Sequence, residues 1–294
     1  MYIFLINLDR RPDRLAHMRA ELNYHKLSFV RIAAVDGTTY PPAVPGQLQN
    51  SQIACHRSHR LCWKEFVESS EPYALILEDD VVLSARFGEF LRQPNYFPAD
   101  ADIIRLEPTR FVSRLAKRRF VTPSGISLHR LFSNQFYTGA YIIFAEAAKK
   151  LLSNDLSHEI PIDILLYTLA SPAQNSKHNL LVYQAVPAPS TQMMLCPDHR
   201  GSSAIATSDI PHIKSSLFHG RGIDRLTPQA REEAIIEVRN EGIIEAENKV
   251  DDSAHPRAPC SRRPPAAVAF VKDILRRPYL LLRGVQDGII AFDV

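Results

Sequence analysis

The sequence lacks the features that mark membrane-spanning, disulfide-rich and strongly charged proteins. Its 294 residues contain no uninterrupted apolar run of the roughly 18 residues that a transmembrane helix needs. The four cysteines are too few for a disulfide framework, so free thiols in a reducing compartment are expected. A formal net charge of +3 argues against a basic face over the whole chain, and therefore against nucleic-acid binding.

The N-terminus also lacks the pattern of a secretory signal. No basic leader precedes its short apolar run, and a charge follows as early as Asp9. We therefore expect a soluble, cytoplasmic protein.

What is present is the composition of an ordinary globular protein, 45% hydrophobic and 23% charged. Short apolar runs alternate with segments of helical periodicity, which is typical of an α/β domain with a mainly parallel mixed sheet. The expected strands are residues 2–7, 29–35, 73–77, 102–106 and 136–144, and the expected helices follow Pro12 or cover residues 52–69 and 146–152.

Composition divides the chain into three parts. Residues 1–210 carry the α/β pattern and are the expected catalytic domain. Residues 211–250 are rich in Glu, Ala and Ile and predict a helical extension. Residues 251–294 combine a Pro-rich linker with a basic, amphipathic C-terminal segment.

An acidic triplet, Glu78-Asp79-Asp80, directly follows the apolar run 73–77. Ligands of open α/β sheets sit at the carboxyl ends of the strands, so three carboxylates there could hold a cation against a phosphorylated ligand. Oxygen ligands suit Mg²⁺ or Mn²⁺. A solvated acidic turn would have the same composition.

A charged run from Asn7 to Arg14 follows the first apolar segment. Backbone N–H groups at a helix start and Arg side chains there could meet phosphate, although a surface charge run looks the same. Further on, Cys55, His59 and Cys62 share one face of a predicted helix. Zinc is one interpretation, but no second ligand pair is evident, so buried free cysteines beside a hydrogen-bonded histidine are favoured.

Several motifs follow one another along the chain: INLDRRPDR at 6–14, AVDG at 34–37, IACHRSH at 53–59 with Trp63, LILEDDV at 75–81, TGAYIIFAEAAKKLL at 138–152 and PID at 161–163. Together they resemble glycosyltransferase family 25, the lipooligosaccharide biosynthesis transferases whose relatives include collagen galactosyltransferase domains. The resemblance covers residues 2 to about 205. The chain departs from the family at Ala54 and Arg57, where the family has Gly and often Leu, and at Met193, where Asp is common after Gln192.

The resemblance implies a GT-A-like fold and a metal-dependent, inverting transfer of a hexose, with galactose expected. The donor would be a UDP-sugar, and the acceptor a hydroxyl of a lipooligosaccharide or LPS core. Glu78 and Asp80 would hold Mn²⁺ or Mg²⁺, which stabilises the departing diphosphate. Asp163 is the candidate general base, although a helix-capping aspartate is an equally ordinary explanation.

The resemblance also assigns contact residues to the two substrates. The third metal ligand stays open between His199 and His219. Core packing is an equal alternative for the two tyrosines among the acceptor candidates. Donor nucleotide contacts are expected from Asn7, Arg10, Arg11, Arg14, Asp36, His59 and Asp79, and acceptor contacts from Tyr137, Tyr141, His199 and Arg200.

Two basic segments bear on the acceptor and the membrane. Residues 105–119 could grip phosphates of a lipid-linked acceptor or form a solvated loop and helix face. Residues 270–292 could lie against anionic lipid at the inner face of the cytoplasmic membrane, or form a helix that packs on the domain. The alternative function is a catalytically silent sugar-binding or scaffolding relative, against which the four intact carboxylates at positions 78, 79, 80 and 163 argue.

Overall fold

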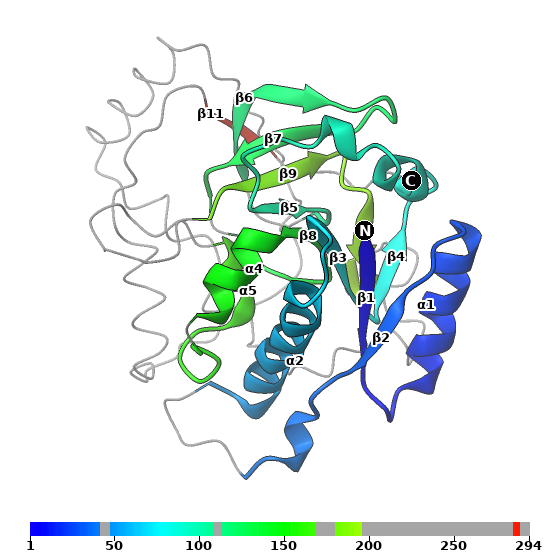
Figure 1. Cartoon of the computed structure of the whole chain (residues 1–294), viewed down its shortest axis with the longest axis vertical. Coiled ribbons are helices and arrows are strands. Elements are labelled where there is room, and N and C mark those ends of the chain that lie inside the picture. Colours follow the sequence, from blue (N-terminus) through cyan, green and yellow to red (C-terminus); the bar gives the residue numbers. More distant parts are fainter. Residues whose placement is uncertain are drawn as a thin grey trace, which may run out of the picture.

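A computed structural model describes residues 1–41, 48–108, 113–133, 135–153, 155–167, 180–195 and 285–288. Most strands join one nine-stranded sheet of order β11-β6-β7-β9-β5-β8-β3-β1-β2, and β10 pairs with β4 (Figure 1). The strands are β1 (Tyr2–Asn7), β2 (Val30–Ala33), β3 (Tyr73–Glu78), β4 (Val81–Leu83), β5 (Ile103–Arg105), β6 (Ser113–Val121), β7 (Ser127–Leu131), β8 (Ala140–Phe144), β9 (Val182–Val186), β10 (Ser190–Gln192) and β11 (Val285–Gly288).

Five α-helices and three short 3₁₀ turns connect the described strands. The turns are η1 (Gly37–Thr39), η2 (Pro94–Tyr96) and η3 (Met193–Leu195). In the described part of the chain no helix is long and apolar enough to cross a membrane. The helices are α1 (Pro12–Tyr24), α2 (Asn50–Val67), α3 (Phe87–Leu91), α4 (Ala145–Leu152) and α5 (Ile162–Tyr167).

The predicted α/β class and mixed sheet are confirmed, with more antiparallel pairing than expected. Pairing is parallel for β1 with β2 and β3 and for β5 with β9, and antiparallel between the other neighbours. One cause is the short connection between β6 and β7, because a tight turn can only return the chain antiparallel. Another is β8, which inserts between β3 and β5 and runs against both.

Alternate side chains of the central strands fill two cores. Phe4 and Ile6 of β1 face the core that contains Trp63 of α2, whereas Ile3 and Leu5 face the core that contains Met18 of α1. This alternation follows from the two-residue period of a strand. Figure 1 shows α2, α4 and α5 together on one side of the sheet and α1 on the other. Because helices cover both faces of the sheet, its central strands are apolar on both sides, which explains the wholly apolar runs in the sequence.

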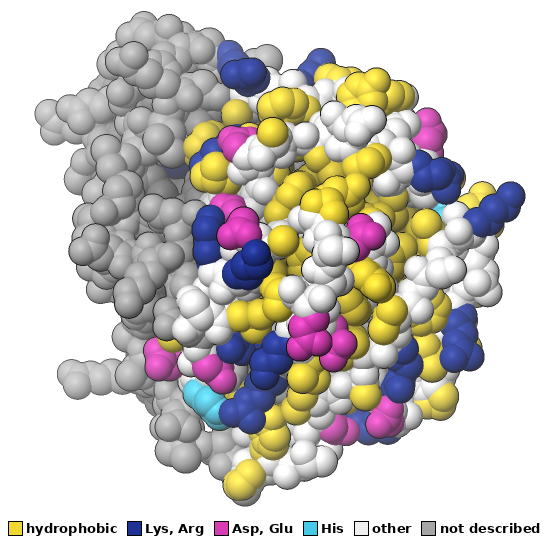
Figure 2. Space-filling view, viewed as in Figure 1, with side chains coloured by type: hydrophobic (Ala, Val, Ile, Leu, Met, Phe, Trp, Pro, Cys, Tyr) yellow, Lys and Arg dark blue, Asp and Glu magenta, His cyan; other side chains and the backbone are white. Residues whose placement is uncertain are grey.

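Two predictions from the basic segments are changed by the fold. Residues 113–121 form strand β6, not the predicted helix face, and Val285–Gly288 of the C-terminal segment forms a strand on the edge of the sheet beside β6. The predicted helical extension 211–250 and the rest of the segment 251–294 lie outside the described residues. On the face seen in Figure 2, positive and negative side chains are interspersed, in keeping with the near-neutral net charge.

A buried polar chain ties helix α2 to the sheet. Trp63 donates its indole N–H to the Tyr141 hydroxyl across 2.9 Å, and Nδ1 of His59 lies 2.9 Å from the same hydroxyl. All three side chains are fully buried. The Tyr141 hydroxyl is therefore a buried hub that satisfies two other polar groups.

Replacing this hub tests its contribution to stability. Tyr141→Phe leaves the Trp63 N–H and one His59 nitrogen without a partner, so we expect a loss of about 1–3 kcal/mol in the free energy of unfolding. The measurement is urea denaturation, with Tyr24→Phe as the matched control because Tyr24 is 73% exposed. Equal stability of the two variants would contradict the role of the hub.

Candidate functional site

The acidic triplet lies where two parallel strands end side by side. In the register of β1 with β3, Ile6 pairs with Glu78, so Asn7 at the end of β1 lies next to the triplet. Because parallel strands present their carboxyl ends at one sheet edge, the two charged motifs that the sequence singled out meet there.

Asp79 is held between side chains of the N-terminal motif. Asn7 donates from Nδ2 to Oδ2 of Asp79 across 2.7 Å, and Arg14 donates from Nη1 to Oδ1 across 2.8 Å. Pro12 at the start of α1 places Arg14 in the first turn of that helix. Asn7, Arg14 and Asp79 are all buried, with Arg14 only 4% exposed.

These three residues were predicted to contact the donor nucleotide. In the structure Asn7 and Arg14 both hydrogen-bond to Asp79 and so position the triplet, and Asn7 also donates to the Arg11 carbonyl and accepts from Arg31.

Asp80 combines burial with an unsatisfied oxygen. Its Oδ2 lies 3.6 Å from Nη1 of Arg14, and its backbone carbonyl accepts the Met193 N–H across 2.8 Å. Its Oδ1 is buried and has no hydrogen-bond partner among the described residues. Burial, together with the negative charge of Glu78, raises the pKa of Asp80 to about 7.

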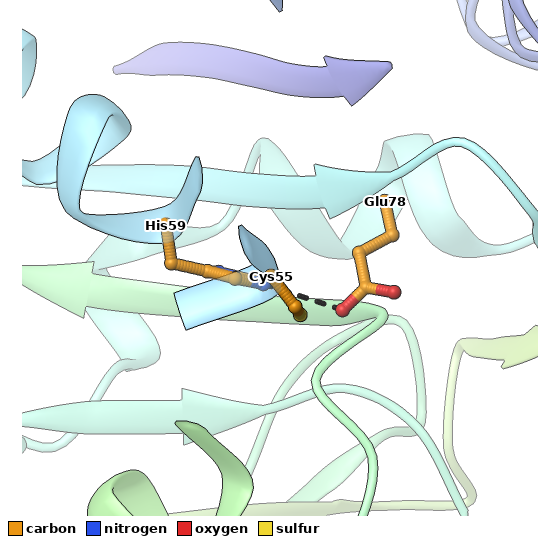
Figure 3. A group of neighbouring side chains, drawn as sticks. All are labelled: Cys55, His59 and Glu78. Atoms are coloured by element: carbon orange, nitrogen blue, oxygen red, sulfur yellow. Dashed lines mark hydrogen bonds and ion pairs between the residues drawn. The ribbon is translucent and has the colours of Figure 1, made fainter. Parts of the chain in front are cut away.

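Glu78 receives three hydrogen-bond contacts from different elements. The Thr138 hydroxyl donates to Oε1 across 2.7 Å, Nε2 of His59 lies 3.3 Å from the same oxygen, and Gln192 donates to Oε2 across 3.4 Å. Figure 3 shows His59 reaching from α2 toward the end of β3. His59 is fully buried, and this contact orients Glu78; a contact of His59 with the donor stays a prediction.

Glu107 is a further carboxylate of this region that sequence reasoning missed. It follows β5 and is fully buried; its Oε1 accepts the Gly139 N–H across 2.9 Å, while its Oε2 has no partner among the described residues. Burial raises its pKa to about 8. The only signal was an acid just after a buried apolar run, the position that Glu78 also occupies.

Gly139 makes this packing possible. A Cβ there would lie 2.8 Å from Cγ of Gln192 and 2.9 Å from Oε2 of Glu107. The glycine therefore lets the two polar side chains approach the backbone between them. This contact gives Gln192 a structural place beside Glu78.

Arg105 is the first residue of the predicted phosphate-gripping segment, but it is fully buried. Its guanidinium donates to the Phe136 carbonyl across 2.8 Å, to Oε1 of Gln184 across 2.9 Å and to the Pro108 carbonyl across 3.1 Å. Arg105 thus holds the loop beside Glu107 together, and it is not available to a lipid phosphate.

Asp163 lies in the first turn of α5, where it accepts backbone hydrogen bonds and also has a raised pKa. Its Oδ1 accepts the Ile164 N–H across 2.8 Å, and the backbone N–H of Tyr137 also contributes a hydrogen bond. Burial raises the pKa of Asp163 to about 6 in spite of these donors. Tyr137 has a φ of 73°, a left-handed conformation that is uncommon for a tyrosine.

The remaining predicted contacts divide by exposure. Arg10 donates to Asp36 across 2.8 Å, and both side chains are partly exposed at the ends of β1 and β2, as is Arg11, which pairs with Asp13. Hydrogen bonds from Thr38 and Arg10 lower the pKa of Asp36. Tyr141 lies in the core, so it cannot form the predicted sugar platform. His199, Arg200 and His219 lie outside the described residues.

The buried Arg14 pair predicts a large stability effect. Arg14→Gln leaves Asp79 and Asp80 buried without their cation, so we expect a loss of about 3–5 kcal/mol in urea denaturation. Arg10→Gln, which removes an exposed pair, should cost less than about 1 kcal/mol. Adding Asp79→Asn to Arg14→Gln should restore part of the loss; equal costs for the two arginine variants would contradict the assignment.

The raised pKa of Glu107 predicts a pH dependence of stability. The folded protein keeps the proton of Glu107, whereas the unfolded carboxyl, with its ordinary pKa of 4.5, releases it. The contribution of Glu107 to the free energy of unfolding is therefore full below pH 4.5 and is lost as pH rises toward about 8. Asp80 and Asp163 act with the same sign. The free energy of unfolding of Glu107→Gln should therefore decline less steeply with pH, by up to about 1.4 kcal/mol per pH unit.

The measurement is urea denaturation of both proteins at several pH values across this window. Glu146→Gln is the matched control, because the Glu146 side chain is 75% exposed and should leave the slope unchanged. A Glu107→Gln protein that declines as steeply as the unaltered protein would contradict the burial of an ionisable carboxyl there.

Comparisons with known proteins show which proteins the chain resembles. The chain is 24% identical over 184 residues to the lipooligosaccharide biosynthesis protein lic2B of Haemophilus influenzae, covering 56% of this chain and 69% of that protein. It is 26% identical over 202 residues to human procollagen galactosyltransferase 2, covering 62% and 31%. A rat protein named probable inactive glycosyltransferase 25 family member 3 is 23% identical over 199 residues, covering 60% and 34%.

The chain thus spans about a third of the length of the human and rat relatives. The sequence model of glycosyltransferase family 25 (LPS biosynthesis protein) matches residues 1–166, which include the N-terminal motif, the acidic triplet and Asp163. This match covers more than half of the chain and confirms the resemblance: the protein belongs to glycosyltransferase family 25.

Proposed function

We propose that this chain is a metal-dependent, inverting glycosyltransferase that moves a hexose, galactose, from a UDP-sugar to a hydroxyl of a lipooligosaccharide or LPS core. Membership of family 25 supports glycosyl transfer, and the names of relatives support galactose and the lipooligosaccharide acceptor. The observation that carries the proposal is the buried Oδ1 of Asp80, which has no partner among the described residues and lies beside Glu78 at the carboxyl edge of β1 and β3.

The donor nucleotide would lie over the partly exposed side chains at this edge. Arg10 and Arg11 offer guanidinium donors that suit phosphate, and the Asp36 carboxylate can accept from a ribose hydroxyl. The Arg10–Asp36 ion pair links the ends of β1 and β2, so both groups are already placed before a ligand arrives.

The carboxylates fit a hard divalent cation. Asp80 would contribute its unpartnered Oδ1, and Oε2 of Glu78 keeps free acceptor capacity because its only hydrogen bond among the described residues is the long one from Gln192. When bound, Mn²⁺ or Mg²⁺ would supply positive charge opposite the diphosphate leaving group. Arg14 offsets part of the negative charge of the triplet when the cation is absent.

Asp163 would act as the general base. Its pKa of about 6 leaves it mostly ionised at neutral pH, yet makes it a stronger base than an ordinary aspartate. The N–H groups of Ile164 and Tyr137 fix the carboxylate, and its remaining acceptor capacity would take the proton from the acceptor hydroxyl as the new glycosidic bond forms. The acceptor oxygen would attack the anomeric carbon from the face opposite the diphosphate, and the bond between that carbon and the diphosphate would break with its electrons on the diphosphate, which inverts the anomeric configuration.

In this proposal the acceptor is lipid-linked, so the reaction takes place at the inner face of the cytoplasmic membrane. Four basic residues lie among apolar ones in the C-terminal segment, namely Lys272, Arg276, Arg277 and Arg283. Such a segment suits anionic lipid. Peripheral contact there would bring the acceptor to the catalytic domain.

The test is transfer and hydrolysis of a panel of UDP-hexoses by the purified chain, with and without Mn²⁺. UDP-galactose should turn over only with the metal. Asp80→Asn and Asp163→Asn should each lower kcat by about 100-fold or more, because each removes charge stabilisation or proton transfer from the transition state.

Glu146→Gln controls for loss of a carboxylate at an exposed site and should keep full activity. If no UDP-hexose binds with any divalent metal while the protein is folded, the carboxylates are structural. The chain would then be a catalytically silent relative, as the name of the rat protein describes that protein.

A further inference from the structure

Three potential metal ligands of different chemistry converge at the first carboxylate of the acidic triplet. Cys55 and His59 lie one turn apart on α2, and Glu78 ends β3 (Figure 3). One ligand atom from each, the Cys55 sulfur, a His59 ring nitrogen and a Glu78 carboxylate oxygen, lies within 4.8 Å of the other two. Spacing of four residues on a helix brings the first two side chains onto one face.

We propose that Cys55, His59 and Glu78 form a binding site for Zn²⁺ or a cation of the same class. Thiolate, imidazole and carboxylate are the three kinds of protein ligand that zinc takes, and three protein ligands leave a fourth position open. Hard cations such as Mn²⁺ and Mg²⁺ prefer oxygen, so the Asp80 region and this cluster should select different metals.

The surroundings of His59 suit a metal ligand. Its Nε2 faces Glu78, whereas its Nδ1 lies 2.9 Å from the Tyr141 hydroxyl, which already accepts from Trp63. A histidine that coordinates through one nitrogen is usually oriented by a hydrogen bond at the other. With a cation at Nε2, the ring proton would sit on Nδ1 and point at the Tyr141 oxygen.

These three ligands differ from those of the zinc interpretation based on the sequence, which combined Cys55 and His59 with Cys62. Cys62 shares the helix face but is fully buried in the core, and it is absent from the cluster. Glu78, 19 residues beyond His59 in the chain, takes the third position because β3 ends beside α2. Cys55 is only partly buried, whereas Cys62 is buried.

Occupancy of this site has a consequence that rests on the proposed function. Glu78 is shared with the proposed Mn²⁺ or Mg²⁺ site. A zinc-class cation bound to Cys55 and His59 would therefore take Glu78 away from that site. Zinc should therefore inhibit sugar transfer even when Mn²⁺ is in excess.

The experiment uses Co²⁺ as a spectroscopic probe on the full chain without oxygen, donor or acceptor. Co²⁺ bound to a thiolate absorbs in the near ultraviolet through charge transfer, and we expect one such site per chain. The proton leaves the Cys55 thiol as the sulfur–metal bond forms. Zn²⁺ should displace the Co²⁺ and abolish the band, whereas excess Mn²⁺ should not.

Matched cysteine variants assign the band. Cys55→Ser should weaken Co²⁺ binding by at least about 100-fold, since even the loss of an orienting partner costs 10- to 100-fold. Cys62→Ser, a change on the same helix, should keep the band. A second measurement needs no variant: Zn²⁺ should protect Cys55 of the unaltered chain from alkylation, as mapped by mass spectrometry.

The proposal is overturned if the unaltered chain shows no thiolate–cobalt band, if the band survives Cys55→Ser, or if Zn²⁺ leaves alkylation of Cys55 unchanged. None of these results depends on turnover. A chain that binds Co²⁺ at Cys55 but transfers no sugar would keep this site and contradict only the proposed function.

Discussion

The buried contact between Arg14 and Asp79 is the constraint on which the acidic edge depends. Two carboxylates of the triplet are taken out of water at the end of β3, and their repulsion and desolvation are offset mainly by one guanidinium. Because Arg14 belongs to the helix that follows β1, the contact also locks that helix against the neighbouring strand. Asn7 completes the arrangement by binding the other oxygen of Asp79.

From this edge a second set of contacts runs back into the core. Glu78 contacts His59, which contacts the Tyr141 hydroxyl, which accepts from Trp63. Each link is buried or partly buried, so a polar group lost from the middle leaves its neighbours unsatisfied. The same residues that stabilise α2 against the sheet therefore set the direction of the carboxylate most exposed to a ligand.

The sequence predicted the fold class, because apolar strands and the helices between them follow from local pattern. It singled out the two charged motifs, but only the parallel register of β1 with β3 shows that they meet. It did not predict which of the polar and charged residues are internal. Asn7, Arg14 and His59 have the composition of ligand contacts, yet their partners come from elements far along the chain. Glu107 was missed for the same reason, since only the packing of β5 beside β8 brings it to Gly139.

The crystal structure of the chain with UDP and Mn²⁺ would test the central claim most directly. We predict an anomalous manganese peak bound by Asp80 and Glu78, with the diphosphate beside it and the nucleoside over Arg10 and Asp36. A nucleotide bound elsewhere on the sheet, or a manganese ion that contacts neither carboxylate, would contradict the account.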